Sequence, residues 1–482
     1  MTGKRRAAGR GDGNVKSPDR TNTAGGWLAA IVALGALAVG YDQGAMSGAL
    51  LFLKHVYRLT VFEREAMVSI VIVGSFVGAI FSGRWCDAAG RRTVLLLASA
   101  LSGIFAVATG LAPTYATFMA SRFLIGVTIG MIVVAAPMYI SEFSRTAMRG
   151  RTSATFQLAF AIGLAGSYWV DFLFSKSGNW RAMFMVGAVP SLILLISLLL
   201  VPDSPRWYFM KGRAAEGEAA LRRVIPEDGP RRAEVERISG ELQRTRDLRR
   251  ASLADLLRPA VRMALLFAVG LSFFGQFTGI NTVTYYSPTV FRYAGFARSD
   301  AIFITAAIGI ITVLATVAGI WLVDRWGRRP LMLTSQITIV TAMTLLGLSF
   351  YLGPRLPGMA VLTVGSVVLF HIAFSMGMGL MGWVYVPEVF PNRVRAQGQS
   401  IARLVTYLST FTITLTFLSM LTALGAAGTF WIFAAVTLLG AIFVSWIAPE
   451  TKNRPLETVE AYWSNNRQWP APDPGADDPA RG

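Results

Sequence analysis

Long stretches without a charged residue dominate this chain, and they constrain its fold more than any other feature. Residues 94–111 and 186–201, for example, contain no acidic or basic side chain. A helix that crosses the hydrocarbon core needs roughly 20 apolar residues, and such runs recur along most of the sequence. Hydrophobic residues make up 54% of the chain and charged residues only 15%, whereas soluble proteins carry about 25% charged residues. The sequence therefore predicts an all-α membrane protein.

Twelve transmembrane helices are expected, in two groups of six. The first group is predicted near 27–53, 65–86, 93–112, 115–141, 152–174 and 181–201. The second is predicted near 260–290, 300–323, 330–352, 359–387, 397–420 and 427–448. The expected domains are a disordered cytoplasmic tail 1–26, an N-terminal six-helix bundle 27–202, a linker 203–259, a C-terminal bundle 260–448 and a cytoplasmic tail 449–482. The linker mixes Arg and Glu at helical spacing, which favours short amphipathic helices on the membrane surface.

The distribution of arginine predicts the orientation. The loops after spans two, four, eight and ten are rich in arginine, whereas residues 422–429 on the opposite side contain no charge. Because Lys and Arg concentrate in cytoplasmic loops, both termini are expected in the cytoplasm of a multi-pass cell-membrane protein. Residues 1–26 lack the apolar core of a cleavable signal peptide.

Composition excludes several other classes of protein. The net charge of +18 would suit a nucleic-acid partner, but the basic residues lie mainly in short loops, so the expected surroundings are a lipid bilayer and no nucleic acid. A single cysteine excludes an internal disulfide, and two widely separated histidines exclude a histidine-based metal cluster. No clustered catalytic set is present. We therefore expect that the protein is not an enzyme and has neither cofactor nor metal; a monomer is expected as well.

The chain also repeats itself. Three sequence patterns of the first half recur in the same order in the second half, each displaced by about 240 residues. They are Asp87-x-x-Gly-Arg-Arg92 with Asp324-x-x-Gly-Arg-Arg329, Tyr139-x-x-Glu142 with Tyr385-x-x-Glu388, and Pro202-Asp-Ser-Pro with Pro449-Glu-Thr-Lys. These repeated motifs predict two parallel six-helix repeats. Such an architecture places a substrate near the midplane of the membrane, between the repeats.

These motifs resemble the sugar porter branch of the major facilitator superfamily over residues 28–456. Residues 40–50 are close to that family's first-helix signature, and residues 83–92 are similar to its loop between helices two and three. Residues 202–206 and 449–452 resemble the sequences that close each half. The segment from Gln276 to Asn281, with Tyr285, is similar to the substrate motif of the seventh helix. The resemblance extends to bacterial sugar/proton and plant polyol/inositol symporters, and it implies the major facilitator fold.

Two charges interrupt apolar spans, and each needs a partner. Asp42 lies near the middle of the first span and Arg122 within the fourth. A lone charge at mid-bilayer costs about 2.5–3.5 kcal/mol even on insertion scales, so we expect the two to pair. Proton coupling is the functional interpretation, which the resemblance supports, since proton-coupled members carry this Asp and Arg. A static salt bridge between helices one and four is the alternative.

The roles of two further intramembrane residues, Arg403 and His371, stay open. Arg403 could extend towards the cytoplasmic surface or line the cavity. An arginine here resembles the plant polyol and inositol porters. His371 could titrate, although a polar side chain satisfied by helix packing is the simpler interpretation.

A sugar or polyol needs amides, which donate and accept hydrogen bonds without net charge, and an aromatic face. Gln157, Gln276, Asn281 and Trp383 supply these groups. The resemblance adds three residues to this set. Tyr285 belongs to the motif of the seventh helix, Thr312 stands where the family commonly has an asparagine in span eight, and Tyr407 is the aromatic residue often found in span eleven. Gly275 and Leu164 stand where the family commonly has glutamine, so the identity of the solute stays open.

Repeated acid–base pairs at the cytoplasmic helix ends predict a gate. We expect an ion-pair network between helices that closes the cytoplasmic side and breaks on opening; the alternative is orientation by positive charge alone. The predicted gate residues are Asp87, Arg91, Arg92, Glu142, Arg149, Asp324, Arg328, Arg329, Glu388 and Arg395.

The predicted function is import of a neutral sugar or polyol by proton symport with alternating access. A facilitative uniporter with the same fold is the nearest alternative. An exporter fits the motifs less well, and a nutrient sensor would need a longer signalling tail.

Overall fold

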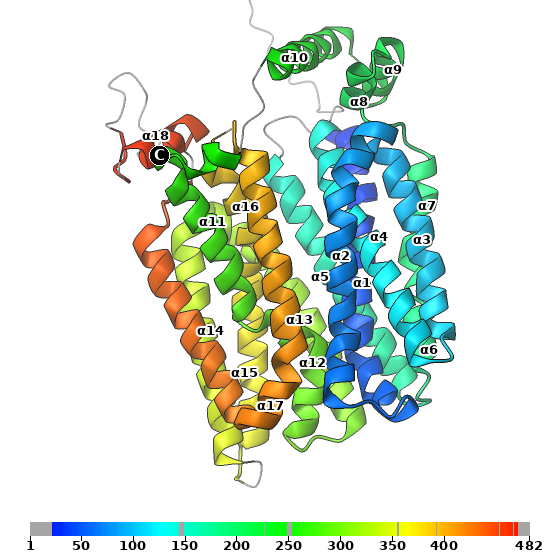
Figure 1. Cartoon of the computed structure of the whole chain (residues 1–482), viewed down its shortest axis with the longest axis vertical. Coiled ribbons are helices and arrows are strands. Elements are labelled where there is room, and N and C mark those ends of the chain that lie inside the picture. Colours follow the sequence, from blue (N-terminus) through cyan, green and yellow to red (C-terminus); the bar gives the residue numbers. More distant parts are fainter. Residues whose placement is uncertain are drawn as a thin grey trace, which may run out of the picture.

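The long apolar runs fold into helices that form two bundles side by side (Figure 1). The computed structural model describes residues 22–143, 149–225, 227–247, 253–353, 356–391, 393–452, 454–465 and 467–470. Ten of its helical segments are long and apolar enough to cross a membrane. One of them, α17, contains two crossings that meet at Gly425 (φ 71°). Together with α1, these segments form the twelve predicted spans, which confirms the fold class.

The N-terminal bundle pairs α2 with α4, α1 with α5, and α3 with both α4 and α7. Helix α1 begins inside the segment 1–26, for which a disordered tail was expected. The helices are α1 Asn22–Val56, α2 Val61–Ala89, α3 Arg91–Leu111, α4 Tyr115–Phe143, α5 Arg149–Ser175, α6 Trp180–Met185 and α7 Ala188–Leu199.

Small residues allow the closest of these contacts. A Cβ added to Gly74 would lie 2.1 Å from the carbonyl oxygen of Phe123, and one added to Gly126 would lie 2.2 Å from that of Val71. Helices α2 and α4 therefore touch backbone to backbone, as the GxxxG spacing in each helix predicts for packing in lipid.

The C-terminal bundle repeats this plan with two interruptions. Its seventh span breaks at Gly279, whose φ of 89° is open to glycine at little cost, and its tenth span contains the π-helical turn η3. The elements are α11 Pro259–Phe277, α12 Ile280–Tyr293, α13 Arg298–Trp326, α14 Arg328–Leu352, α15 Met359–Ala373, η3 Phe374–Met378, α16 Gly379–Val389 and α17 Arg395–Ile447.

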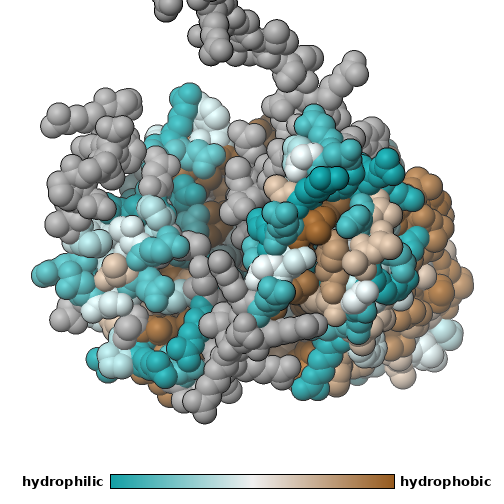
Figure 2. Space-filling view, turned by 90° about the horizontal axis from the view of Figure 1, so that it is seen from above, coloured by the Kyte–Doolittle hydropathy of each residue, from teal (hydrophilic) through white to brown (hydrophobic). Residues whose placement is uncertain are grey.

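The polar elements gather at one end of the molecule, called here the linker end (top of Figure 1). They are α8 Pro205–Met210, α9 Ala214–Val224, α10 Asp228–Asp247, η2 Leu253–Leu257 and α18 Leu456–Ser464. Seen from this end, hydrophilic side chains cover much of the described surface (Figure 2). Apolar side chains such as Leu173, Leu200 and Val361 are 69%, 75% and 76% exposed, which suits residues in contact with lipid.

The two bundles are joined at the end opposite the linker and diverge towards the linker end (Figure 1). The backbone N–H and hydroxyl of Ser419 on α17 both donate to the buried carboxylate of Glu65 on α2, each at 2.7 Å. Ser69 and Thr414 approach to 3.1 Å between the same two helices. These contacts close the opposite end.

Candidate functional site

A cavity of about 450 Å³ lies between the two bundles and is lined by residues of both. This volume is within the usual range for small-molecule sites, about 300–1,000 Å³. Its polar lining comes from α1, α5, α11, α12, α13, α15, η3, α16 and α17. The polar lining residues are Gln43, Gln157, Ser272, Gln276, Asn281, Thr284, Thr312, His371, Ser375, Trp383, Gln399, Arg403, Thr406 and Thr410.

A chain of amides crosses this cavity from one bundle to the other. Gln43 Nε2 donates to Asn281 Oδ1 at 2.9 Å, and Asn281 Nδ2 donates to Gln276 Oε1 at 2.6 Å. Thr410 Oγ1 donates to the same Gln276 oxygen at 3.0 Å. In a regular helix, Gln276 and Asn281 would lie on adjoining faces; the break at Gly279 brings their amides together.

The cavity is aromatic on its linker side. The rings of Trp383 and Phe156 lie 5.1 Å apart across the bundle interface, and the guanidinium carbon of Arg403 lies 5.1 Å from the centroid of Trp383. Of the two alternatives for Arg403, the structure therefore favours the one in which it lines the cavity. Trp383 belongs to the predicted binding set, and Gln157 lines the same cavity.

His371 and Thr312 form a buried pair in the cavity wall. Thr312 Oγ1 donates to the Ile308 carbonyl at 2.9 Å, so its oxygen accepts from His371 Nδ1–H, at 3.4 Å. This assignment leaves His371 Nε2 as an acceptor, and it has no partner among the described residues. His371 therefore places a buried hydrogen-bond acceptor without a described partner in the cavity wall.

Two predicted binding residues lie outside the cavity lining. Tyr407 packs its ring edge-to-face on Phe76 of α2, with centroids 6.1 Å apart. The cavity-facing side of α17 carries Thr406 and Thr410 instead, so position 407 is turned towards the other bundle. Tyr285 is only 5% exposed and lies near the charges of Asp42 and Arg122, while its neighbour Thr284 lines the cavity.

Sequence reasoning missed Gln43. Its signal was weak because it follows Asp42 directly, and neighbouring helix residues point about 100° apart. Asp42 faces the interior of its own bundle, whereas Gln43 faces the cavity.

Asp42 and Arg122 form an ion pair between α1 and α4, as their burial requires. The Arg122 side chain is 0% exposed and that of Asp42 14% exposed. Among the described residues, Asp42 Oδ2 and Arg122 Nε and Nη2 lack hydrogen-bond partners. A void of about 10 Å³, lined by Asp42 and Phe184, is close to the smallest that holds a water.

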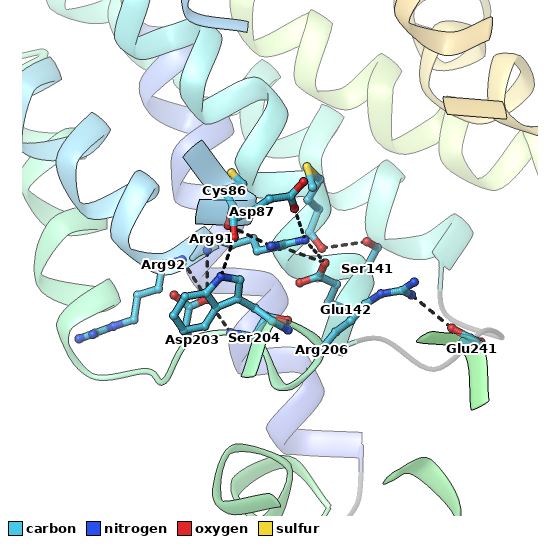
Figure 3. Close-up of polar contacts among 12 residues, drawn as sticks. Cys86, Asp87, Arg91, Arg92, Ser141, Glu142, Asp203, Ser204, Arg206 and Glu241 are labelled. Carbon is cyan, nitrogen blue, oxygen red and sulfur yellow. Dashed lines mark hydrogen bonds and ion pairs between the residues drawn. The ribbon is translucent and has the colours of Figure 1, made fainter. Parts of the chain in front are cut away.

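At the linker end of the N-terminal bundle, Arg91 joins α2, α3 and α4 (Figure 3). Its Nη2 lies 2.9 Å from Glu142 Oε1 and 3.2 Å from Asp87 Oδ1. Asp203 Oδ1 accepts the backbone N–H groups of Arg91 and Arg92 at 3.1 and 3.3 Å. Burial raises the pKa of the Asp203 carboxyl above its ordinary value, while these backbone N–H groups oppose the rise.

The C-terminal bundle contains the same arrangement. Arg328 Nη2 lies 3.1 Å from Glu388 Oε1, and Arg328 Nη1 lies 3.9 Å from Asp324 Oδ1. Glu450 accepts the backbone N–H groups of Arg328 and Arg329 at 3.1 and 3.0 Å, which makes it the counterpart of Asp203. The sequence repeat is thus a repeat of contacts.

The remaining predicted gate residues are placed differently. Arg92 Nε donates to the Leu198 carbonyl at 2.8 Å, and Arg395 donates to the Phe390 carbonyl at 3.2 and 3.3 Å. The side chain of Arg149 lies outside the described part of the chain. The ion pairs of Arg91 and Arg328 each link helices within one bundle, and their role as a cytoplasmic gate stays a prediction.

Two parallel six-helix bundles around a polar interfacial cavity define a secondary transporter of the major facilitator fold. The chain belongs to the sugar transporter family: the profile described as "Sugar (and other) transporter" matches residues 28–463.

Individual relatives agree with this family. The chain is 33% identical to the arabinose-proton symporter of Bacillus subtilis, over 89% of this chain and 93% of the relative. It is 32% identical to the probable polyol transporter 6 of Arabidopsis thaliana, over 91% and 94%. Among solved structures, the inward open xylose transporter XylE from E. coli is similar with a TM-score of 0.77 and 27% identity, over 90% of this chain and 99% of that one.

Proposed function

We propose that this protein imports a sugar or polyol together with a proton by alternating access. The observation that supports this most directly is the Gln43–Asn281 hydrogen bond, which joins the two bundles across the cavity. Gln43 is the residue next to Asp42. One helix, α1, therefore contacts both the site of protonation and the site of the solute. The names of the relatives, an arabinose-proton symporter, a polyol transporter and a xylose transporter, support the same chemistry.

The arginine-rich linker end is cytoplasmic in this proposal, which puts both termini in the cytoplasm of a plasma-membrane protein that acts as a monomer. The structure then corresponds to an inward-facing state. Contacts between α2 and α17 close the external side, and the bundles diverge towards the cytoplasm (Figure 1).

Coupling follows from the pairing of Asp42 with Arg122. An ionised Asp42 neutralises the buried guanidinium, whereas a protonated Asp42 leaves that cation without its counter-charge. The two protonation states therefore favour different arrangements of α1 and α4. Because α1 also carries Gln43, a solute that competes for the Asn281 amide acts on the same helix, which links proton and solute.

The charge clusters act as the cytoplasmic gate in this proposal. In the inward-facing state each cluster fixes the helix ends of its own bundle. When the bundles close, the two clusters approach each other, and new pairs between them stabilise the outward-facing state.

Uptake into proteoliposomes under an imposed pH difference tests the proposal. Wild-type protein should concentrate a sugar or polyol when the outside is acidic. Asp42→Asn should abolish this concentration but keep exchange of labelled for unlabelled solute, since exchange needs no net proton movement. Equal, gradient-independent equilibration by both proteins would instead identify a uniporter, and absence of any flux would reject transport of these solutes.

A further inference from the structure

Arg403 is the one cationic arginine or lysine side chain in the described lining of the cavity. It lies on the face of α17 that also carries Gln399, Thr406 and Thr410, and its guanidinium lies against the indole of Trp383 at 5.1 Å. An aromatic face holds a guanidinium by one side and leaves its N–H edge free to donate. The cation is thus positioned in the same space as the amide chain.

No acidic side chain on the cavity wall neutralises this cation. The described lining contains neither Asp nor Glu, and the part of α5 from Arg149 to Val170, on the facing bundle, has none in its sequence either. Arg403 makes no ion pair among the residues that the structure describes. Asp42 is paired with Arg122 and lies outside this lining.

Water can solvate Arg403 while the cavity is open to the linker end. When that end closes, the guanidinium loses water, and an unpaired buried charge is strongly unfavourable. A ligand that brings its own negative charge removes this penalty. A carboxylate matches the planar guanidinium with two parallel hydrogen bonds.

We infer that the preferred substrate is a polyhydroxylated carboxylate, a sugar acid of the uronate or aldonate type, with its carboxylate on Arg403 and its hydroxyls on the amide chain. This inference rests on the proposed function and changes the expected solute from a neutral one to an anion. The amides of the cavity favour a neutral solute, whereas a cationic Arg403 in the same cavity favours an anionic one.

The charge balance of transport follows. One monoanionic substrate moving with one proton carries no net charge. The pH difference across the membrane should therefore drive uptake, and the electrical potential should not. A neutral sugar moving with one proton carries one positive charge and responds to both.

Proteoliposomes with the full chain test this inference. Uptake of labelled D-glucuronate and D-gluconate is compared with uptake of D-glucose and D-glucitol, first under a pH difference with the potential clamped at zero, then under a potential alone. The carboxylates should be favoured by on the order of tenfold or more, and only the pH difference should drive them. Arg403→Gln should bring the ratio of acid to neutral uptake close to one, and Arg403→Lys should restore part of it.

Arg222→Gln on the exposed face of α9 is the matched control, because it removes one positive charge far from the cavity and should leave the ratio unchanged. Proton-driven uptake of glucose or glucitol in preference to the acids would overturn the inference but keep the proposed function. Preference for a sugar phosphate over the sugar acid would overturn the carboxylate assignment. Loss of acid and neutral uptake to the same extent in Arg403→Gln would also count against it, whereas no flux of any compound would reject the proposed function itself.

Discussion

At the scale of single residues, the cavity combines hydrogen-bonding groups that already have partners with groups that have none among the described residues. Gln276, Asn281 and Gln43 satisfy one another, so a solute must displace part of this chain to bind. His371 Nε2 is buried in the cavity wall and has no described partner, so a solute hydroxyl that reaches it would bind without breaking a hydrogen bond.

Replacing His371 tests this difference. His371→Phe keeps a ring of similar size but removes the acceptor, so the KM for the transported solute should rise about tenfold, the value of one or two hydrogen bonds. His371→Gln, which retains an acceptor, should show a smaller rise. Initial uptake rates over a range of solute concentrations provide both KM values, and equal KM values in all three proteins would contradict a role in binding.

At the residue scale, the sequence predicts a contact where a residue has only one possible partner. Asp42 and Arg122 had to pair because lipid offers no other counter-charge. Tyr407 could not be assigned in this way, because the face of a helix that points to the cavity is set by packing between bundles. Tyr407 is only one position along the helix from Thr406, which does line the cavity.

At the scale of elements, the broken seventh span creates the binding geometry. The sequence has a glycine at this break, Gly279, which permits a bend, but it does not show the direct bond between Gln276 and Asn281. That bond depends on where α12 restarts, which is next to the close packing of Gly279 on Phe433.

Gly279→Ala should therefore impair transport. Its φ of 89° is unfavourable for alanine, and the added Cβ would lie 2.7 Å from the Phe433 ring. Backbone strain of roughly 1–3 kcal/mol should lower the melting temperature and raise the KM for the solute. Gly166→Ala is the control because no atom lies within 4 Å of its added Cβ. A Gly279→Ala protein with unchanged melting temperature and KM would contradict this account of the break.

A second element-scale prediction concerns the closed end between α2 and α17. Glu65 accepts two hydrogen bonds from Ser419 across the bundle interface. Hydrogen bonds to a charged group contribute roughly 1.5–3 kcal/mol, so Glu65→Gln should shift the population towards the state open at this end. A single cysteine introduced at Ser69, in a Cys86→Ser background, should then react faster with a membrane-impermeant maleimide added outside than it does with Glu65 intact. An unchanged labelling rate would show that the Glu65–Ser419 hydrogen bonds do not hold this end closed.

At the scale of the whole molecule, transport requires two states of similar free energy, and a mutation shifts their ratio only when its residue interacts differently in each. The duplicated charge clusters allow a comparison within one chain. In the N-terminal cluster Glu142 Oε1 binds Arg91, and the Ser204 side chain interacts with the Glu142 carboxylate, but Glu142 Oε2 has no hydrogen bond as short as those of Glu388 among the described residues. In the C-terminal cluster both oxygens of Glu388 are occupied, by Arg328 and Thr451.

This asymmetry predicts unequal effects of two equivalent mutations. When the linker ends meet in the outward-facing state, Glu142 can gain a partner from the other bundle, whereas Glu388 must first give one up. Glu142→Gln should therefore shift the population inward more than Glu388→Gln does. Spin labels at Arg84→Cys on α2 and Trp326→Cys on α13, in a Cys86→Ser background, report the separation of the linker ends by pulsed electron paramagnetic resonance. A longer mean distance in Glu142→Gln than in Glu388→Gln is expected, and the reverse order would show that Glu142 Oε2 does not hold the closed linker end.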